Sequence, residues 1–510
     1  MLSQINACGL MGIDGFMVRV QTDISNGIPS LNVVGLPDIA VKEAKERIHS
    51  AIRNTGFKFP SKHITINLAP ANKRKEGTAY DLPLAVSILN ASGQLNTDDI
   101  DDAVFIGELS LDGSVMNVSG VLPMVISAYK LGYKKFFVPA GNANEAAVVK
   151  DAQVYPVNSL RDILLHFCGD TKLERRVVDT EKYFKHHPSA MLDFCDVKGQ
   201  ESVKRALEVA AAGNHNIILI GPPGTGKTML AQRMNTILPD MSFDEALEVT
   251  KIHSIAGVLP KDRPLITERP FRNPHHTVSS VGLSGGGTMP RPGELSLAHN
   301  GILFLDELPE FRRDVLETLR QPIEDGKVTI SRVSATLTYP CNIMLIASMN
   351  PCKCGYYGDS RRKCTCTPAQ IAKYRRRISG PLLDRIDIQA EVSGIPYETL
   401  SQIDKGESSA DIKKRVDKAR RIQLERYKGK GIYSNSQLSA GMLQEFCPLG
   451  QMENKLLKSA FDSLGLSARA HSRILKVART IADLNGSDDI KAAHIAEAIS
   501  YRSLDRKFFS

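Results

Sequence analysis

The sequence predicts a multidomain α/β protein that ends in an all-helical region, and three observations support this. At 510 residues, the chain is longer than one ordinary hydrophobic core can hold. Strand-like and helix-like segments alternate through residues 1–168 and again through 190–392, whereas residues 393–510 show only the 3.6-residue period of helices. A charged stretch with few periodic apolar positions, 169–189, separates the first two regions, and we expect it to be a linker.

The composition is that of a globular protein, since 24% of the residues are charged and 42% are hydrophobic. The N-terminal sequence MLSQINACGLMGIDGF lacks the basic region and long apolar core of a signal peptide, and no apolar run reaches membrane-spanning length. The nine cysteines are few, and a group of them crowds into one segment, which argues against a secreted disulfide framework. We therefore expect a cytoplasmic protein without a membrane partner. The net charge of +9 permits a polyanionic partner without requiring one.

The first region has the pattern of a mixed α/β module. Residues 18–22 and 64–68 alternate like half-buried strands, while 41–54 and 81–89 carry apolar residues at helical spacing. Asp112-Gly113 stands between two apolar runs and predicts a hairpin turn. The module should therefore have a core of its own.

The second region opens with a phosphate-binding pattern. An apolar run at 217–220 precedes the string GPPGTGKT, and a helix-like segment follows it. The glycines let backbone N–H groups turn inward around a phosphate, Lys227 supplies positive charge, and the Thr228 hydroxyl can hold Mg²⁺. We interpret the whole Walker A string as the ATP-binding loop: Gly221, Pro222, Pro223, Gly224, Thr225, Gly226, Lys227 and Thr228.

Two further strands end in polar residues. The apolar run 301–305 leads to Asp306 and Glu307, a Walker B pattern in which the first carboxylate serves Mg²⁺ and the second polarises the attacking water. The run 342–348 leads to Asn350, whose amide we expect to orient water or the γ-phosphate as sensor 1. The sequence thus predicts ATP hydrolysis with Mg²⁺.

Arginines further along the chain can supply charge to the reaction. Phosphoryl transfer requires positive charge at the γ-phosphate, and we interpret Arg385 as a finger that acts on a neighbouring subunit. The alternative is an intramolecular salt bridge from Arg385 to Asp384 or Asp387. Arg473 begins a periodic helix and could reach the phosphates as sensor 2, with Arg469 as the alternative.

Four strings carry a family resemblance: RPFRNPHHTVSSVGLSGGG, PGELSLAHNGILFLDELPEF, YRRRISGPLLDRIDI and SARAHSRILKVARTIADL. They closely resemble magnesium-chelatase-like AAA+ ATPases of the ComM (YifB) type, and the resemblance covers essentially the whole chain. It implies an AAA+ P-loop NTPase module over 190–392 and a helical lid over 393–510. It also implies a hexameric ring with ATP at subunit interfaces, and a bacterial DNA motor of branch migration, recombination and natural transformation. A helix-2 insert at 272–292 and a pre-sensor-1 hairpin at 326–338 would face the ring's pore.

The first module, 1–168, has a resemblance of its own. Its strings KEGTAYD and GELSLDG look like the proteolytic S5-type domain of Lon, whose activity needs a serine nucleophile with a lysine beside it. The serine position falls on Ala79, and the lysine position falls near 122–124, where there is no lysine. We therefore expect a Lon-protease-like fold that serves DNA contact, assembly or partner binding. Thr78 has no evident base, and we interpret it as a turn residue.

A cysteine cluster lies just after Asn350. Two C-x-C pairs stand nine residues apart: Cys352 with Cys354, and Cys364 with Cys366. Four thiolates fit one tetrahedral Zn²⁺, and we favour zinc over the alternatives of reduced thiols or two redox pairs. His275 and His276 are adjacent, so their imidazoles point apart on most backbones, and we assign them to a polar insert loop.

Basic residues concentrate in two clusters. The second basic cluster, residues 411–430, holds nine Lys or Arg against three Asp or Glu. Such residues can neutralise phosphates, and interleaved tyrosines can stack on unpaired bases. A solvated helix face explains the second cluster equally well. The first basic cluster comprises Arg361, Arg362, Lys363, Lys373, Arg375, Arg376 and Arg377, among Tyr356, Tyr357 and Tyr374.

Together with the resemblance, these features predict an ATP-driven translocase or helicase that acts on single-stranded or branched DNA as a homo-hexamer. Two alternatives remain open. One is a magnesium-chelatase-type motor that remodels a protein partner, although the Lon-like extension argues against it. The other is an ATP-dependent protease, against which the missing serine and lysine argue.

Overall fold

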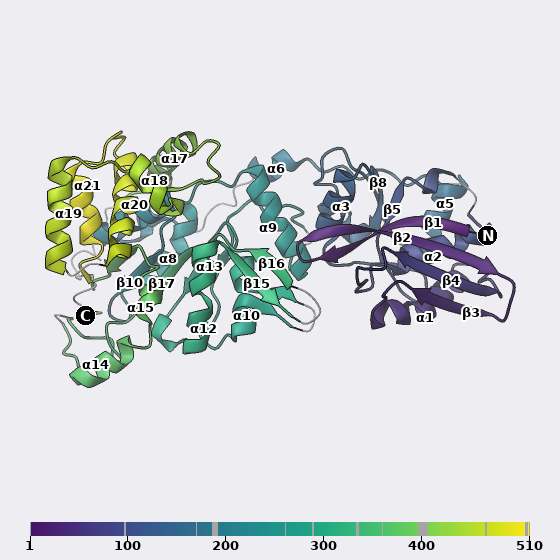
Figure 1. Cartoon of the computed structure of the whole chain (residues 1–510), viewed down its shortest axis with the longest axis horizontal. Helices are drawn as coiled ribbons and strands as arrows, with labels where there is room; N and C mark the ends of the chain where they lie inside the picture. Colours follow the sequence, from purple (N-terminus) through teal and green to yellow (C-terminus); the bar gives the residue numbers. More distant parts are fainter. Residues whose placement is uncertain are drawn as a thin grey trace. The chain divides into compact units, whose positions relative to one another are not determined.

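The computed structural model describes the chain except residues 1, 96–97, 170, 186–191, 261, 288–289, 333–335, 360, 396–405, 465–466, 505–507 and 509–510. It confirms a mixed α/β protein with a helical C-terminal region. The chain (Figure 1) folds into two compact units. Unit 1 comprises Met1–His186, Ser242–Thr267 and Ser331–Thr338, and unit 2 comprises His187–Met241, Glu268–Ile330 and Tyr339–Ser510. The predicted boundaries at 168 and 392 stay predictions, and those at 189 and 190 lie outside the described residues.

Unit 1 is built on a seven-stranded mixed sheet of order β3-β4-β2-β1-β5-β8-β9. The β1–β2 and β2–β4 pairs are antiparallel, and the other neighbours are parallel. Both predicted strands are confirmed, one inside β2 and one inside β4. The strands are β1 (Leu2–Met11), β2 (Asp14–Ser25), β3 (Ser30–Val34), β4 (His63–Ala69), β5 (Ala103–Phe105), β8 (Lys135–Pro139) and β9 (Gln153–Val157).

Both predicted helices of this unit are also confirmed. In the first, the Asp38 side chain accepts the N–H of Val41 and caps the helix, which buries Ile48 and Ile52 against the sheet. The predicted hairpin joins β6 (Glu108–Leu109) to β7 (Val115–Met116), with Gly113 at φ +89°. The helices are α1 (Ile39–Asn54), α2 (Asp81–Ala91), α3 (Val121–Lys130), α4 (Ala143–Ala146), α5 (Leu160–Cys168), α6 (Thr180–Lys185) and α9 (Phe243–Ala256).

Unit 2 contains a five-stranded parallel sheet of order β11-β14-β17-β10-β18. Its three central strands, β14, β17 and β10, are fully buried, and all of their residues except Ser348 are apolar, as a sheet covered on both faces requires. Because the strands are parallel, their carboxyl ends meet at one edge, where α/β proteins bind ligands. The strands are β10 (Ile217–Ile220), β11 (Phe271–Arg272), β14 (Ile302–Leu305), β17 (Met344–Met349) and β18 (Ile388–Glu391).

Short elements fill the two regions that the resemblance marked as pore elements. In the insert, β12 (Gly285–Gly286) pairs with β13 (Arg291–Pro292). In the hairpin, β15 (Lys327–Ser331) and β16 (Thr336–Pro340) form a two-stranded sheet. Residues 288–289 and 333–335 of these segments lie outside the described residues, and a position facing a pore stays a prediction.

The C-terminal helices share one hydrophobic core with the parallel sheet. Ile412 and Val416 of α17 and Ile474 of α20 belong to the same buried cluster as Leu207 of α7 and Leu219 of β10. Helices α19, α20 and α21 lie side by side (Figure 1). The helices of unit 2 are α7 (Glu201–Gly213), α8 (Lys227–Arg233), α10 (Ser280–Ser284), α11 (Glu294–Leu297), α12 (Arg313–Thr318), α13 (Arg320–Asp325), α14 (Pro368–Arg375), α15 (Gly380–Leu383), α17 (Ser409–Arg426), α18 (Ala440–Phe446), α19 (Gln451–Leu464), α20 (Ala468–Leu484) and α21 (Ala492–Ser500).

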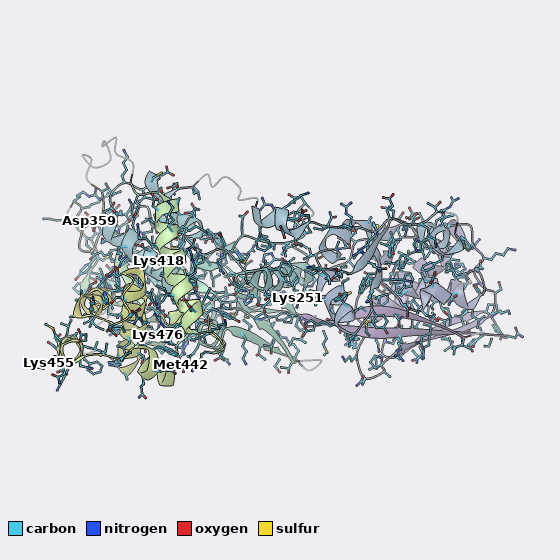
Figure 2. The ribbon with its side chains drawn as sticks, turned by 90° about the horizontal axis from the view of Figure 1, so that it is seen from above. Lys251, Asp359, Lys418, Met442, Lys455 and Lys476 are labelled. Carbon is cyan, nitrogen blue, oxygen red and sulfur yellow. The ribbon has the colours of Figure 1, made fainter. Side chains whose placement is uncertain are left out.

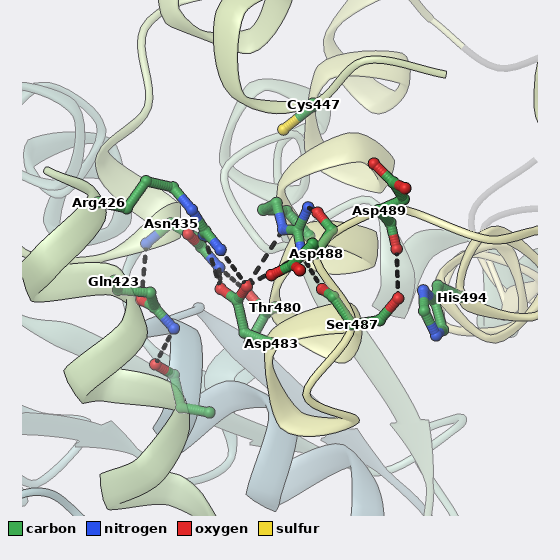
Figure 3. A network of polar contacts seen from close by, with 12 residues as sticks. Gln423, Arg426, Asn435, Cys447, Thr480, Asp483, Ser487, Asp488, Asp489 and His494 are labelled. Atoms are coloured by element: carbon green, nitrogen blue, oxygen red, sulfur yellow. Dashed lines mark hydrogen bonds and ion pairs between the residues drawn. The ribbon is translucent and has the colours of Figure 1, made fainter. Parts of the chain in front are cut away.

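A buried polar network joins α17 to α20 (Figure 3). The Asp483 carboxylate, 1% exposed, accepts hydrogen bonds from Arg426 at 2.6 and 2.9 Å and from Arg479 at 3.2 Å. Asn435 donates to Asp483 at 2.9 Å and to Thr480 at 3.0 Å. Thr480 contacts the His215 ring at 2.7 Å, next to the start of β10. The helical region is therefore fixed to the sheet by directional contacts as well as by apolar packing.

Candidate nucleotide site

The Walker A string forms the loop between β10 and α8, as predicted. Gly224 and Gly226 have φ values of +76° and +86°, which favour glycine. Gly221 is constrained by space, because a Cβ there would lie 2.1 Å from the carbonyl oxygen of Val392. The loop conformation thus depends on glycine at these positions.

Lys227 carries a buried amine at the centre of the loop. Its Nζ donates to the carbonyls of Gly221 and Pro222, both at 2.8 Å, and to Asn350 Oδ1 at 3.0 Å. All three acceptors are neutral, and burial lowers the pKa of Lys227 to about 8, although Asp306 and Glu307 act in the opposite direction. An anion bound in the pocket would compensate for the lost hydration of this ammonium group.

Oxygen atoms converge at the adjacent edge of the sheet. Thr228 Oγ1 donates to Asp306 Oδ2 at 2.9 Å, and the Ser348 hydroxyl donates to Asp306 Oδ1. Hydroxyl and carboxylate oxygens are ligands that Mg²⁺ accepts, directly or through water. Thr228 and Asp306 therefore fit the predicted magnesium site. Sequence reasoning missed Ser348, although its place at the end of the strand run 342–348 was a usable signal.

Glu307 has an unusual backbone conformation. Its φ is +52°, a left-handed value that is costly for a residue other than glycine. Its N–H donates to Ser348 Oγ at 3.2 Å and to Asp306 Oδ1 at 3.1 Å, and these bonds hold the strained turn. Strain of this kind concentrates at functional sites, where it places a side chain for use.

The structure brings most of the predicted residues into one pocket of about 420 Å³. The combination of a buried amine, two carboxylates and an amide can bind a polyphosphate with its metal ion and activate a water molecule. Gly221 and Pro222 do not line this pocket, but their carbonyl oxygens accept hydrogen bonds from Lys227 Nζ. The lining residues are Pro223, Gly224, Thr225, Gly226, Lys227, Thr228, Met229, Asp306, Glu307, Ser348 and Asn350.

The predicted arginines lie in a different pocket, of about 600 Å³, that shares no lining residue with the first. Arg385 Nη2 pairs with Glu324 of α13, and its Nη1 donates to the Pro381 carbonyl at 2.8 Å. Arg385 therefore does form a salt bridge, but not with either aspartate that the sequence suggested.

Those two aspartates pair with the sensor-2 candidates. Arg473 pairs with Asp387, whose carboxylate also contacts His215 Nδ1 at 3.3 Å. Arg469 Nη1 lies 3.5 Å from Asp384. Burial opposes the charge of Asp387, yet Arg473 and His215 hold the pKa of this carboxyl well below its usual range. Arg469 and Arg473 thus lie with Arg385, away from the Walker loop of their own chain.

Three family models match the chain: magnesium chelatase, subunit ChlI, at residues 193–400, subunit ChlI of Mg-chelatase at 20–142, and the ChlI C-terminal model at 406–502. The protein named YifB of Salmonella typhimurium is 44% identical over 506 residues, which cover 99% of this chain and 98% of YifB. The competence protein ComM of Haemophilus influenzae is 43% identical over 500 residues, which cover 97% of this chain and 96% of ComM. The chain belongs to the magnesium-chelatase-like family of YifB and ComM. A shorter match, 24% identical over 176 residues, covers 31% of this chain and 50% of the magnesium-chelatase 38 kDa subunit of Rhodobacter capsulatus.

Membership in this AAA+ family agrees with the chemistry of the pocket. The matched region 193–400 contains the Walker loop, both carboxylates and Asn350. Family and pocket together indicate an ATPase that uses ATP and Mg²⁺. No helix in the described part of the chain has the length and apolar character needed to cross a membrane.

The cysteine cluster begins two residues after Asn350. Its four sulfur atoms lie within 4.8 Å of one another, and all four cysteines are free thiols. The two predicted pairs therefore meet at one point. The prediction that His275 and His276 point apart is wrong, because their ring centroids lie 4.0 Å apart with the ring planes tilted by 36°. They join no metal-binding group within the described residues.

The two basic clusters differ in how their charges are used. In the second, six of the nine basic side chains bind partners within the chain: Lys413, Lys414, Arg415, Arg420, Arg426 and Lys430. The first cluster keeps most of its side chains exposed, although Arg361, Arg362 and Arg375 donate to the Ile395 carbonyl, the Tyr356 hydroxyl and the Pro351 carbonyl, and Arg377 pairs with Glu310. The first cluster is therefore the more exposed of the two.

In unit 1, the residues at the predicted protease positions are apolar or already paired. Ala79 is 7% exposed, and Leu122 and Met124 are buried on α3. The Thr78 hydroxyl donates to Glu108, and the buried Lys75 amine donates to the Pro70 carbonyl. A Lon-protease-like fold without a proteolytic dyad stays a prediction.

Proposed function

We propose that this chain is an ATP-driven DNA translocase or helicase that acts in the cytoplasm on branched DNA during recombination or natural transformation. It works as a homo-hexameric ring that hydrolyses ATP at subunit interfaces. One observation carries the oligomeric part of this proposal: the phosphate pocket and the arginine pocket of unit 2 share no lining residue. Arginines placed in this way serve a phosphate only when a neighbouring subunit presents it.

Within one subunit, Lys227 contacts the outer phosphates, and Thr228 with Asp306 holds the metal ion that neutralises them. Glu307 accepts a proton from the attacking water, and Asn350 orients the water or the γ-phosphate. Arg385 of the next subunit stabilises the charge that develops in the transition state. Arg473 or Arg469 provides a second guanidinium from the same neighbour, because both lie with Arg385.

Two observations favour DNA as the substrate. The relative from Haemophilus influenzae is named a competence protein. The first basic cluster is mostly exposed, and Arg362 lies over the Tyr356 ring at 4.6 Å, an aromatic and cationic surface suited to single-stranded nucleic acid. The Lon-like module of residues 1–168 then contributes binding or assembly, since it lacks the protease dyad.

ATPase rates measured with and without forked or four-way DNA, across a salt series, test this proposal, with Lys227→Ala as the blank. We expect DNA to stimulate hydrolysis and its affinity to fall linearly on a log–log plot against salt, because binding releases counterions. ATPase rates that do not change when DNA is added would reject the proposed DNA motor. The chelatase-type alternative expects stimulation by a protein partner instead. Casein cleavage would revive the protease alternative.

A further inference from the structure

We propose that Cys352, Cys354, Cys364 and Cys366 bind one Zn²⁺ ion that supports the nucleotide pocket. The sulfur atoms already have nearly the required spacing. Cys352 and Cys354 Sγ lie 3.3 Å apart, Cys354 and Cys364 Sγ 3.5 Å, and Cys352 and Cys364 Sγ 3.6 Å. Ligands about 2.3 Å from a tetrahedral zinc ion are about 3.8 Å from one another, whereas disulfide-bonded sulfurs lie about 2.05 Å apart.

The backbone around the cluster is organised to present these sulfurs. The Gly355 N–H donates to the Cys352 carbonyl at 3.0 Å, and a φ of +89° at Gly355 closes a tight turn. The Cys366 N–H points to Cys364 Sγ at 3.4 Å. Between the pairs, the Asp359 side chain (Figure 2) accepts the N–H groups of Arg361 and Arg362 at 2.6 and 2.9 Å. Each pair of thiols is thereby held by its own turn.

Charge around the cluster suits a zinc tetrathiolate, which carries two net negative charges. Arg375 interacts electrostatically with both Cys352 and Cys364, and its Nε donates to the Pro351 carbonyl at 3.1 Å. Lys353 and Lys363 stand next to the ligands in sequence. These cations can offset the two negative charges of a zinc tetrathiolate.

The loop that carries the cysteines also touches both walls of the nucleotide pocket. Cys352 follows Asn350, the acceptor of the Lys227 ammonium, after a single proline. On the other side, Gly355 packs so closely on the Walker loop that a Cβ there would lie 2.5 Å from Pro223 Cδ. A metal ion that fixes this loop therefore fixes Asn350 and Pro223 together. This coupling rests on the proposed ATPase function, whereas the zinc site does not.

Metal analysis of the full-length protein, purified without chelator, tests the site. We expect about one zinc per chain, and replacement by Co²⁺ should give the strong visible bands of tetrahedral cobalt thiolate. Cys354→Ser and Cys364→Ser should each lose the metal, whereas Cys168→Ser, at an exposed cysteine outside the cluster, should keep it. If the serine variants do not fold, zinc release from the wild-type protein by a thiol reagent provides the same measurement. Wild-type protein without zinc, zinc retained in the serine variants, or two disulfides found by mass spectrometry would overturn the site.

The coupling is tested by ATP affinity. Zinc-free protein should bind ATP at least about tenfold more weakly than zinc-loaded protein, because Asn350 and Pro223 lose a common support. Gly355→Ala should keep its zinc and also bind ATP more weakly. Gly358→Ala is the matched control, since Gly358 has a similar φ of +82° but no atom within 4 Å of its would-be Cβ. Equal ATP affinity in all four samples would overturn the coupling. If zinc-loaded wild-type protein binds no ATP at all, the ATPase function fails while the zinc content still decides the site.

Discussion

ATP binding should weaken as pH rises above 8, because the Lys227 amine titrates there. Its pKa of about 8 in the free protein reflects burial among neutral acceptors. Between about pH 7.5 and about pH 9.0, the protonated fraction falls from about 0.76 to about 0.09. If only the ammonium form binds phosphate, the dissociation constant for ATP rises about eightfold over this range. The γ-phosphate of ATP loses its last proton below this pH range, so the charge of ATP does not change across it.

Unfolding does not explain such a loss. A lysine whose folded pKa is lowered binds fewer protons in the folded state than in the unfolded state between about pH 8 and its ordinary value. This group therefore makes the folded state more stable, not less, as pH rises through the window. Loss of affinity at pH 9 would report the binding site itself.

The measurement is the anisotropy of a fluorescent ATP analogue with Mg²⁺ at constant ionic strength, since the chain has no tryptophan to report binding. Lys227→Arg keeps its charge at every pH in the window, so its affinity should be independent of pH. Lys227→Met should bind weakly and equally at all pH values. A flat profile in the wild-type protein, or a profile in Lys227→Met as steep as that of the wild type, would refute the reasoning.

Four further predictions follow from the same geometry. Glu307→Gln should bind ATP normally but hydrolyse it at least about 100-fold more slowly in single-turnover assays, because the amide cannot accept the proton of the attacking water; rapid hydrolysis would reject Glu307 as the base. Mixing inactive Arg385→Ala and Lys227→Ala chains in equal amounts should restore about a quarter of wild-type ATPase activity, since about a quarter of random interfaces pair an intact Walker loop with an intact arginine. No recovery of activity in well-formed mixed rings would favour a purely structural Arg385–Glu324 salt bridge. Asp483→Asn should lower the free energy of unfolding by about 3–5 kcal/mol in denaturant titrations, because Arg426 and Arg479 lose a buried anion. The control, Lys430→Gln, breaks an exposed ion pair with Glu445 and should lower the free energy of unfolding by less than about 1 kcal/mol. Arg469→Ala should reduce ATPase activity without changing the melting temperature, whereas Arg473→Ala should lower both. A thermal shift assay in which Arg469→Ala lowers the melting temperature and Arg473→Ala does not would contradict this assignment.

The nucleotide pocket could be predicted from the sequence because its information is local. Each functional residue stands at the end of an apolar run, and parallel strands bring such ends to one edge of a sheet. Lys227 and Asp306 are 79 positions apart in sequence, yet strand order places both in one pocket. The same logic, applied fully, would have included Ser348, the last residue but one of β17, which pairs with the strand that precedes Asp306.

Pairings between distant, irregular segments could not be predicted in this way. Arg385 pairs with Glu324, 61 positions earlier, rather than with the aspartates beside it in sequence. Segment α9 lies within the predicted ATPase module in sequence but groups with unit 1, where Ser254 bonds the buried Glu145 at 2.8 Å. Both outcomes depend on tertiary packing that no periodicity encodes. The cysteine cluster lies between these cases, since spacing predicted the pairs and only the fold brings the two pairs together.

The ion pairs of the arginine pocket differ in how readily they can open toward a neighbour's phosphate. Arg385 is 13% exposed, but its partner Glu324 is 62% exposed, so solvent screens this ion pair and it is held more weakly than a pair with a buried carboxylate. Arg469 is itself 63% exposed and lies 3.5 Å from its aspartate, so it is held as weakly. Arg473, in contrast, compensates the buried Asp387, and removing it from a buried carboxylate costs about 3–5 kcal/mol. In the ring that we propose, a triphosphate at the interface would therefore draw Arg385 and Arg469 from their partners while Arg473 stays paired with Asp387, and this favours Arg469 as the second cation of the reaction.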